Sequence, residues 1–128
     1  MRKKILLVED SAILREGINN MLSSSGKAEI DDFAVSQQDA ISLLEHKQYD
    51  LMIVDIELAE GNGFEVVKHT LSDAYPHEPP VFVMLTNNAF KYYRDFARSL
   101  GIKYFFDKSM EFDLAIEKIE ALASQQSE

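Results

Sequence analysis

Short apolar runs alternate along this chain with longer segments that have helical periodicity. Such alternation is typical of an α/β protein in which a parallel sheet is covered by helices on both faces. The strands of such a sheet are central and buried. We therefore predict five strands, at Lys4–Val8, Ala28–Ala34, Leu51–Val54, Val81–Leu85 and Lys103–Phe106.

Five helices are predicted between and after these strands. Gly26 is a stop signal for the first helix, and Ser36 begins the second, with Asp39 three residues later as a variant of a capping box. Ile13 is expected on the apolar stripe of the first helix. The predicted ranges are about Ala12–Ser24, a helix from Ser36, about Phe64–Leu71, Ala89–Leu100, and about Met110–Ala123 with Ser109 as its N-cap.

Length and charge limit what the chain can do. Its 128 residues fit one domain of ordinary size, and a hydrophobic content of 46% supplies one core. With 13 basic and 22 acidic residues, the formal charge of −9 repels the phosphate backbone of nucleic acids. We therefore expect no direct nucleic-acid binding.

No targeting segment or membrane span is predicted. The apolar run that begins at Ile5 ends at Val8, before Glu9 and Asp10, and is too short for a signal core or a membrane span. The absence of cysteine suits a reducing cytoplasm. A polar tail, Ser124–Glu128, follows the last helix, and the lack of a linker favours a free-standing chain.

Polar residues follow four of the predicted strands, and ligand sites of open parallel sheets form at the carboxyl ends of strands. Three carboxylates, one hydroxyl and one ammonium would face a common crevice there. Crowded carboxylates repel one another unless a hard cation neutralises them, and Mg²⁺ prefers oxygen ligands. The residues are Glu9 and Asp10 after the first strand, Asp55 after the third, Thr86 after the fourth and Lys108 after the fifth.

Each of these residues also has a simpler interpretation when it is taken alone. A Glu-Asp pair after a strand is more often a helix cap or a solvated turn, and a lysine near a strand end is usually a surface residue. Four matches in order, each at the end of a strand, favour a site over these separate interpretations.

Four segments around these residues resemble the receiver domain of bacterial response regulators, and in particular single-domain, chemotaxis-regulator-like receivers. The resemblance covers essentially the whole chain, residues 1–128, with an ordered core of about 3–123. It implies a flavodoxin-like, doubly wound parallel sheet with strand order 2-1-3-4-5. The segments are ILLVEDS, LMIVDIELAEGNGFEV around Asp55, VFVMLTNN with Thr86, and GIKYFFDKS leading to Lys108.

The resemblance also implies a role for each matching residue. Asp55 would be the phosphoacceptor, and Mg²⁺ would bind the carboxylates of Asp10 and Asp55, the backbone carbonyl of Glu57, and Glu9 through water. Positioning and charge neutralisation do most of the work in phosphoryl transfer, which fits this set of groups.

Three more roles follow from the same resemblance. Lys108 would contact a phosphoryl oxygen, and Thr86 would donate its hydroxyl to the bound phosphoryl group. Phe105 falls at the position of the family's aromatic switch residue and would fill the space that Thr86 vacates.

The sequence departs from the family pattern around the site. Ser109 and Ala59 stand where proline is common, so whether the Lys108–Ser109 bond is cis or trans is open, while Gly63 keeps the family's glycine. Asn87 stands where the family has a very small residue, and its bulk is expected to slow phosphorylation by small donors. Glu57 and Asn88 occupy positions at which the family tunes the attack of water.

The fourth helix, fifth strand and fifth helix form the usual output surface of receivers. The segment NNAFKYYRDFARSLG lies in it, and Phe90 and Phe96 are expected on the core-facing stripe of the helix. At least one of Tyr92 and Tyr93 must point outward, where exposed aromatic side chains suit an interface.

These expectations describe a stand-alone response regulator, not an ordinary enzyme. Its partners would be a sensor histidine kinase or histidine phosphotransfer protein and an unknown downstream protein, and it would be a monomer or a weak phosphorylation-dependent dimer. Three alternatives stay open: a phosphorelay intermediate, a receiver-fold interaction module that is weakly phosphorylated, and an unrelated metal-dependent α/β hydrolase.

Overall fold

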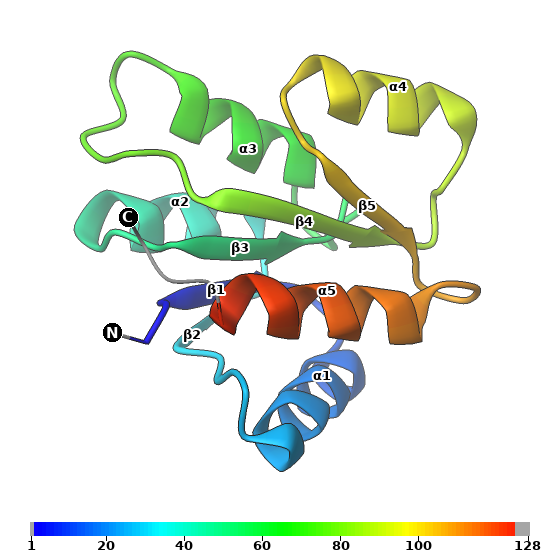
Figure 1. Ribbon diagram of the computed structural model, residues 1–128. Coiled ribbons are helices and arrows are strands. Elements are labelled where there is room, and N and C mark those ends of the chain that lie inside the picture. The colour runs from blue at the N-terminus through cyan, green and yellow to red at the C-terminus, as the bar shows by residue number, and fades with distance from the viewer. Residues whose placement is uncertain (1, 125–128) are drawn as a thin grey trace.

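A parallel sheet of five strands runs through the centre of the protein, in the order β2-β1-β3-β4-β5 (Figure 1). The computed structural model describes residues 2–124. The predicted fold class and strand order are confirmed. The strands are β1 (Ile5–Val8), β2 (Asp32–Ala34), β3 (Leu51–Val54), β4 (Val81–Thr86) and β5 (Tyr104–Asp107).

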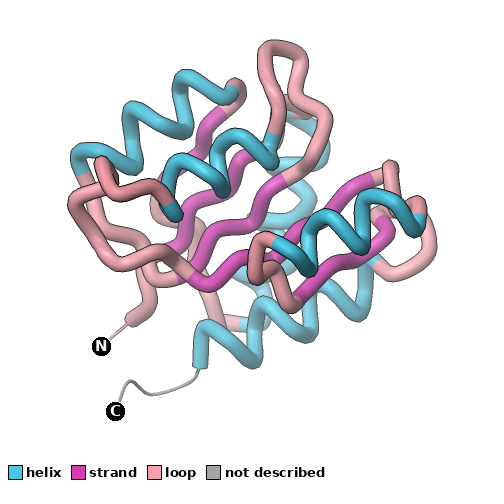
Figure 2. Tube along the Cα trace, turned by 90° about the horizontal axis from the view of Figure 1, so that it is seen from above, coloured by secondary structure: helices cyan, strands magenta, loops and turns pink. Residues whose placement is uncertain are grey.

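Helices cover both faces of the sheet, α1 and α5 on one face and α2, α3 and α4 on the other (Figure 1). The view from above in Figure 2 shows the same layers, with the strands between helices. The helices are α1 (Ala12–Ser25), α2 (Gln37–His46), α3 (Gly63–Leu71), α4 (Lys91–Ser99) and α5 (Phe112–Ser124).

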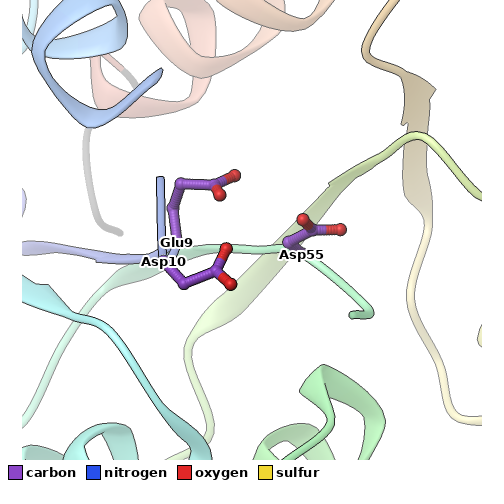
Figure 3. Close-up of side chains that lie close together, drawn as sticks. All are labelled: Glu9, Asp10 and Asp55. Atoms are coloured by element: carbon purple, nitrogen blue, oxygen red, sulfur yellow. The ribbon is translucent and has the colours of Figure 1, made fainter. Parts of the chain in front are cut away.

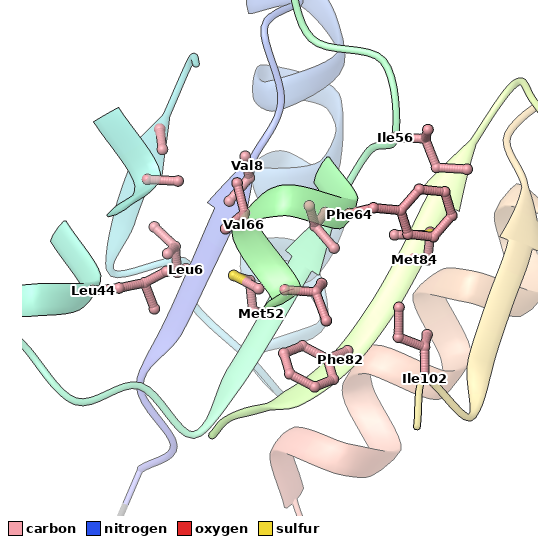
Figure 4. Packing of buried hydrophobic residues seen from close by; sticks show 14 of the residues in the cluster. Leu6, Val8, Leu44, Met52, Ile56, Phe64, Val66, Phe82, Met84 and Ile102 are labelled. Carbon is pink, nitrogen blue, oxygen red and sulfur yellow. The ribbon is translucent and has the colours of Figure 1, made fainter. Parts of the chain in front are cut away.

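Successive residues of the central strands β1 and β3 belong to different hydrophobic clusters, one on each face of the sheet. Ile5 and Leu7 of β1 pack in the cluster with α1 and α5, whereas Leu6 and Val8 pack in the cluster on the opposite face (Figure 4). Side chains alternate across a strand, so a sheet that is covered on both faces needs apolar residues at every position. This requirement explains the continuous apolar runs in the sequence.

Strand β2 is shorter than predicted, because the chain pairs with β1 only from Asp32 and not from Ala28. The carboxylate of Asp31 accepts a hydrogen bond of 2.7 Å from the backbone N–H of Ile5. The side chain of Asp31 therefore accepts the hydrogen bond that a backbone carbonyl of a longer β2 would accept from Ile5. The earlier residue Ile30 is still buried in the cluster beside α1 and α5.

Helix α5 begins at Phe112, and the prediction of Ser109 as its N-cap is wrong. The carboxylate of Asp107 accepts hydrogen bonds from the backbone N–H groups of Ser109 (2.8 Å) and Met110 (3.3 Å). These bonds fold the residues after β5 into a turn, so the helix starts later. No cis peptide bond occurs among residues 2–124, so the Lys108–Ser109 bond is trans.

Two side chains that were expected in the core are exposed instead. Phe90 is 67% exposed, because α4 begins at Lys91, two residues later than predicted, and Phe90 lies outside the helix as its N-cap. Ile13 is 83% exposed, because it lies away from the face of α1 that carries Ile18 and Leu22. Phe96, by contrast, packs against the core as expected.

Within residues 2–124, no helix is long and apolar enough to cross a membrane. The predicted polar tail from Ser124 falls almost wholly on residues 125–128, which lie outside the described part of the chain.

Candidate functional site

The carboxyl ends of β1, β3, β4 and β5 meet at one edge of the sheet and surround a cavity of about 250 Å³. All the predicted site residues that follow strands line this cavity. Thr86 is the last residue of β4 rather than the residue after it. The cavity is lined by Glu9, Asp10, Ser11, Leu14, Asp55, Glu57, Thr86, Asn87, Asn88 and Lys108.

Three carboxylates gather on one side of the cavity. Glu9, Asp10 and Asp55 each offer an oxygen within 4.8 Å of the others, and Figure 3 shows the three side chains close together. Glu9 is only 2% exposed and Asp55 only 8%. Asp10 is more exposed than these two. Negative charges this close, two of them buried, repel one another strongly, so the site needs cations.

Lys108 supplies one positive charge. Its ammonium lies 2.6 Å from Oε1 of Glu9 and 2.7 Å from Oδ2 of Asp55, and its side chain is buried with theirs. Burial alone would lower the pKa of Lys108, but the hydrogen bonds and charges of Asp55 and Glu9 outweigh it and raise that pKa. Lys108 is therefore a charged group at the bottom of the cavity.

Burial also dominates the protonation of Glu9. It raises the pKa of this carboxyl, and the hydrogen bonds from Lys108 and from the backbone N–H of Ser11 offset the effect only in part. The direction of the pKa shift shows that Lys108 and Ser11 do not fully offset the cost of burying this carboxylate.

The cluster has room for a second cation. Oδ1 of Asp55 is buried and accepts no hydrogen bond from any described residue, an arrangement that is costly for a carboxylate. Oδ2 of Asp10 accepts a hydrogen bond of 2.7 Å from the backbone N–H of Ala59. A proline at position 59 could not donate this bond. The oxygen donors fit a hard divalent cation such as Mg²⁺.

Thr86 and the two residues after it also line the cavity. Thr86 is fully buried, and its hydroxyl accepts a hydrogen bond of 3.1 Å from the backbone N–H of Asn88. The side-chain amide of Asn88 donates to the carboxylate of Glu57. Glu57 also forms an isolated antiparallel bridge with Asn62.

Gly63 holds the loop after Asp55 in place. A Cβ atom on Gly63 would lie 1.9 Å from the backbone oxygen of Asp55, so only glycine allows this approach. The N–H of Gly63 donates to the oxygen of Ile56 over 2.8 Å. The first residue of α3 therefore packs directly against the backbone of Asp55.

Phe105 lies apart from the cavity. It is partly buried in β5 and packs against the core below α4, opposite Met84 in the sheet register. The guanidinium of Arg94 lies over its ring, with Cζ 4.8 Å from the ring centre. The sequence predicts Arg94 on the outer side of the helix, and nothing in the local pattern indicates that its side chain lies above β5.

Comparison with known proteins agrees with this geometry. The family of the response regulator receiver domain matches residues 5–120. A curated relative, a protein-glutamate methylesterase/protein-glutamine glutaminase of Aliivibrio fischeri, is 29% identical over 123 residues, which is 96% of this chain and 32% of that protein. The chain thus spans a third or less of the length of the first curated relatives that it matches.

Two solved structures share the fold. The non-phosphorylated HemR receiver domain of Leptospira biflexa has a TM-score of 0.82 and 26% identity, and the match covers 99% of this chain and 98% of that one. The response regulator domain of Thermotoga maritima CheB has a TM-score of 0.79 and 22% identity, with 100% of both chains covered.

The family match covers most of the chain, and the geometry of the site agrees with the features that the family shares. Receiver domains are phosphorylated on an aspartate and bind Mg²⁺ in an acidic pocket. The chain belongs to the response-regulator receiver domain family of two-component signalling.

Proposed function

We propose that this protein is a switch that takes a phosphoryl group on Asp55 from a phosphohistidine. One observation carries the proposal: Oδ1 of Asp55 is buried with no hydrogen-bond partner among residues 2–124, beside two more carboxylates and the ammonium of Lys108. A nucleophile, a cation site and a fixed positive charge thus meet in one cavity. Phosphoryl transfer needs little else from a protein.

The reaction divides among the residues of the cavity. An oxygen of Asp55 attacks phosphorus, the phosphorus–nitrogen bond of the donor breaks, and the nitrogen's electron pair stays on the histidine. Mg²⁺, when bound, supplies positive charge beside the transferring oxygens. Lys108 lies within hydrogen-bond reach of Asp55 and would neutralise a second phosphoryl oxygen.

The proposed ligands of Mg²⁺ are the carboxylates of Asp10 and Asp55, the backbone carbonyl of Glu57, and Glu9 through water. Asp10 and Asp55 belong to the acidic cluster, and Glu57 lines the same cavity. Because Glu9 is paired with Lys108, an indirect contact suits it better than direct coordination.

The phosphoryl group would then change the surface around α4. Thr86 would exchange its hydrogen bond from the N–H of Asn88 for one to the phosphoryl group, and Phe105 would move into the space behind it. The output surface consists of α4, β5 and α5. Tyr92, 75% exposed on α4, is a candidate anchor for the downstream protein.

Residues 1–128 would form one receiver domain, acting in the cytoplasm where histidine kinases and phosphotransfer proteins present their phosphohistidines. We expect a monomer, or a weak dimer when it is phosphorylated. The same chemistry would serve a phosphorelay intermediate. It would also serve the receiver part of a longer regulator, which the greater length of the curated relatives favours.

A second candidate function is an interaction module that is weakly phosphorylated. The side-chain amide of Asn88 donates a hydrogen bond to the carboxylate of Glu57 at the cavity. Asn87 adds bulk to the lining of the same cavity. Asn87 would slow phosphorylation by small donors, and Glu57 and Asn88 would tune the attack of water on the acyl phosphate.

Intact-mass spectrometry with acetyl phosphate and Mg²⁺ tests the proposal. We expect a hydroxylamine-labile phosphoryl adduct on the wild type that is absent from Asp55→Asn and from an EDTA-treated sample. An adduct that persists in Asp55→Asn would show another acceptor. No adduct on any sample would favour the interaction module.

A further inference from the structure

One side chain of α4 connects the loop after β4, the face of β5 that lies below α4, and the residue just before α5. This side chain is Arg94. Its Nε donates a hydrogen bond of 3.1 Å to the carbonyl of Ala89, three residues after Thr86. Its Nη2 lies 3.1 Å from Oε1 of Glu111, and its guanidinium covers the ring of Phe105.

The Glu111 contact extends this network to the end of β5. The same carboxylate oxygen, Oε1, accepts a hydrogen bond of 3.0 Å from the backbone N–H of Asp107, the residue before Lys108. The hydrogen bond from Asp107, followed by that from Arg94, holds the pKa of Glu111 below its usual value. Glu111 is therefore a charged partner for Arg94.

We propose that Arg94 is a positioning residue that holds the switch in its unphosphorylated arrangement. This inference rests on the function proposed above, in which Thr86 and Phe105 move together. Arg94 contacts both segments that would rearrange, because Ala89 follows Thr86 in the β4–α4 loop and Phe105 lies on β5.

The contacts of Arg94 set the direction of its effect. An inward movement of Phe105 takes the ring away from the guanidinium, and a shift of the Thr86 loop pulls the Ala89 carbonyl from Nε. Both interactions are made in the unphosphorylated arrangement and lost in the other. Interactions that favour one state of a two-state equilibrium oppose the ligand that selects the other state.

The test compares Arg94→Ala with Arg98→Ala. Arg98 lies one turn further along α4, is well exposed and pairs with Asp95. Arg98→Ala therefore removes one positive charge from the helix and leaves the contacts of Arg94 with Phe105 and Glu111 in place. Arg94→Lys keeps the charge but loses the planar group that covers the ring and reaches two acceptors.

Two readouts follow the switch in folded protein. The first is the ¹⁹F resonance of 4-fluorophenylalanine placed at position 105, recorded with and without acetyl phosphate and Mg²⁺. The second is the rate at which the Asp55 adduct forms. The melting temperature of each variant checks that it is folded.

We expect the unphosphorylated Arg94→Ala and Arg94→Lys proteins to show a resonance shifted toward the position of phosphorylated wild type. Their adducts should form about two- to tenfold faster, the factor expected from losing one cation–π contact and one partly exposed ion pair. Arg98→Ala should match the wild type in both readouts.

The outcomes separate this inference from the function on which it rests. A wild type that forms no adduct would overturn the proposed function and the inference with it. A wild type that is phosphorylated and switches normally, beside Arg94 variants that behave like Arg98→Ala or form the adduct more slowly, would overturn the role of Arg94 alone.

Discussion

Only glycine fits at position 63, because the backbone oxygen of Asp55 occupies the place where a Cβ atom would stand. A single hydrogen atom at this position lets α3 begin directly against the loop that carries the proposed phosphoacceptor. The hydrogen bond from Gly63 to Ile56 then fixes the direction in which that loop leaves β3. The geometry of Asp55 therefore depends on a residue that does not line the cavity.

Gly63→Ala should destabilise the protein by about 1–3 kcal/mol or more, because the added methyl group forces backbone apart in a packed region. Gly17→Ala is the matched control. A Cβ on Gly17 meets nothing within 4 Å, and alanine in helix α1 should stabilise by about 0.5–1 kcal/mol. Urea denaturation measures both variants, and equal midpoints would contradict the account.

At the residue scale, the sequence was sufficient to predict which groups line the cavity. Glu9, Asp10, Asp55 and Lys108 each follow a strand, and parallel strands carry such residues to one edge of the sheet. It was not sufficient for Arg94, whose contacts join residues far apart in the chain and depend on how α4 packs above β5.

At the scale of elements, the short strand β2 is anchored by side chains as well as by its ladder. The hydroxyl of Tyr49 donates a hydrogen bond of 2.6 Å to Asp32, and Lys47 pairs with the same oxygen over 3.0 Å. Burial raises the pKa of Asp32, but these bonds outweigh it and hold that pKa below its usual value. Burial and the contact with Asp32 raise the pKa of Tyr49.

Tyr49→Phe should weaken the acid dependence of stability. A carboxyl whose pKa is lowered by folding contributes stability above its unfolded pKa, near 3.8 for Asp32, and that contribution is lost as the pH falls through the folded value. The variant should lose about 1–2 kcal/mol at neutral pH and less below pH 3.

Unfolding midpoints in urea between pH 7 and pH 2 measure this difference. Tyr75→Phe is the control, because the buried hydroxyl of Tyr75 has no hydrogen-bond partner among the described residues. Its stability should stay parallel to that of the wild type over the acid range. A Tyr49→Phe curve that also runs parallel to the wild type would contradict the role of the Asp32 contact.

Helix and strand limits were predictable where a local signal decides them. Ser36 accepts a hydrogen bond from the N–H of Asp39, and the Asp39 carboxylate accepts one from Val35, so the expected capping box begins α2. The predicted starts of β2 and α5 were wrong. The carboxylates of Asp31 and Asp107 each accept hydrogen bonds from backbone N–H groups that a longer strand or an earlier helix would otherwise use.

At the scale of the whole molecule, the chain carries a formal charge of −9, and three of its carboxylates gather at the site. A cation that binds only the folded protein stabilises it, whereas salt in general only screens the surface charge. Stabilisation by a bound cation depends on the carboxylate of Asp55, whereas screening of the surface charge does not.

Mg²⁺ at about 100 times its dissociation constant should raise the free energy of unfolding by about 2.7 kcal/mol. Sodium chloride at the same ionic strength should have a smaller effect, and Asp55→Asn should lose most of the difference between the two salts. Thermal unfolding in matched buffers measures this. Equal effects of both salts on the wild type would mean that the acidic cluster binds no Mg²⁺.

The most direct measurement locates the phosphoryl group itself. Treating the phosphorylated protein with borohydride reduces an aspartyl phosphate to homoserine, and tandem mass spectrometry of its peptides then identifies the modified position. We expect homoserine at position 55 and unmodified Glu9 and Asp10, although all three carboxylates lie at the same cavity. Reduction at Asp10 or Glu9, with Asp55 intact, would contradict it.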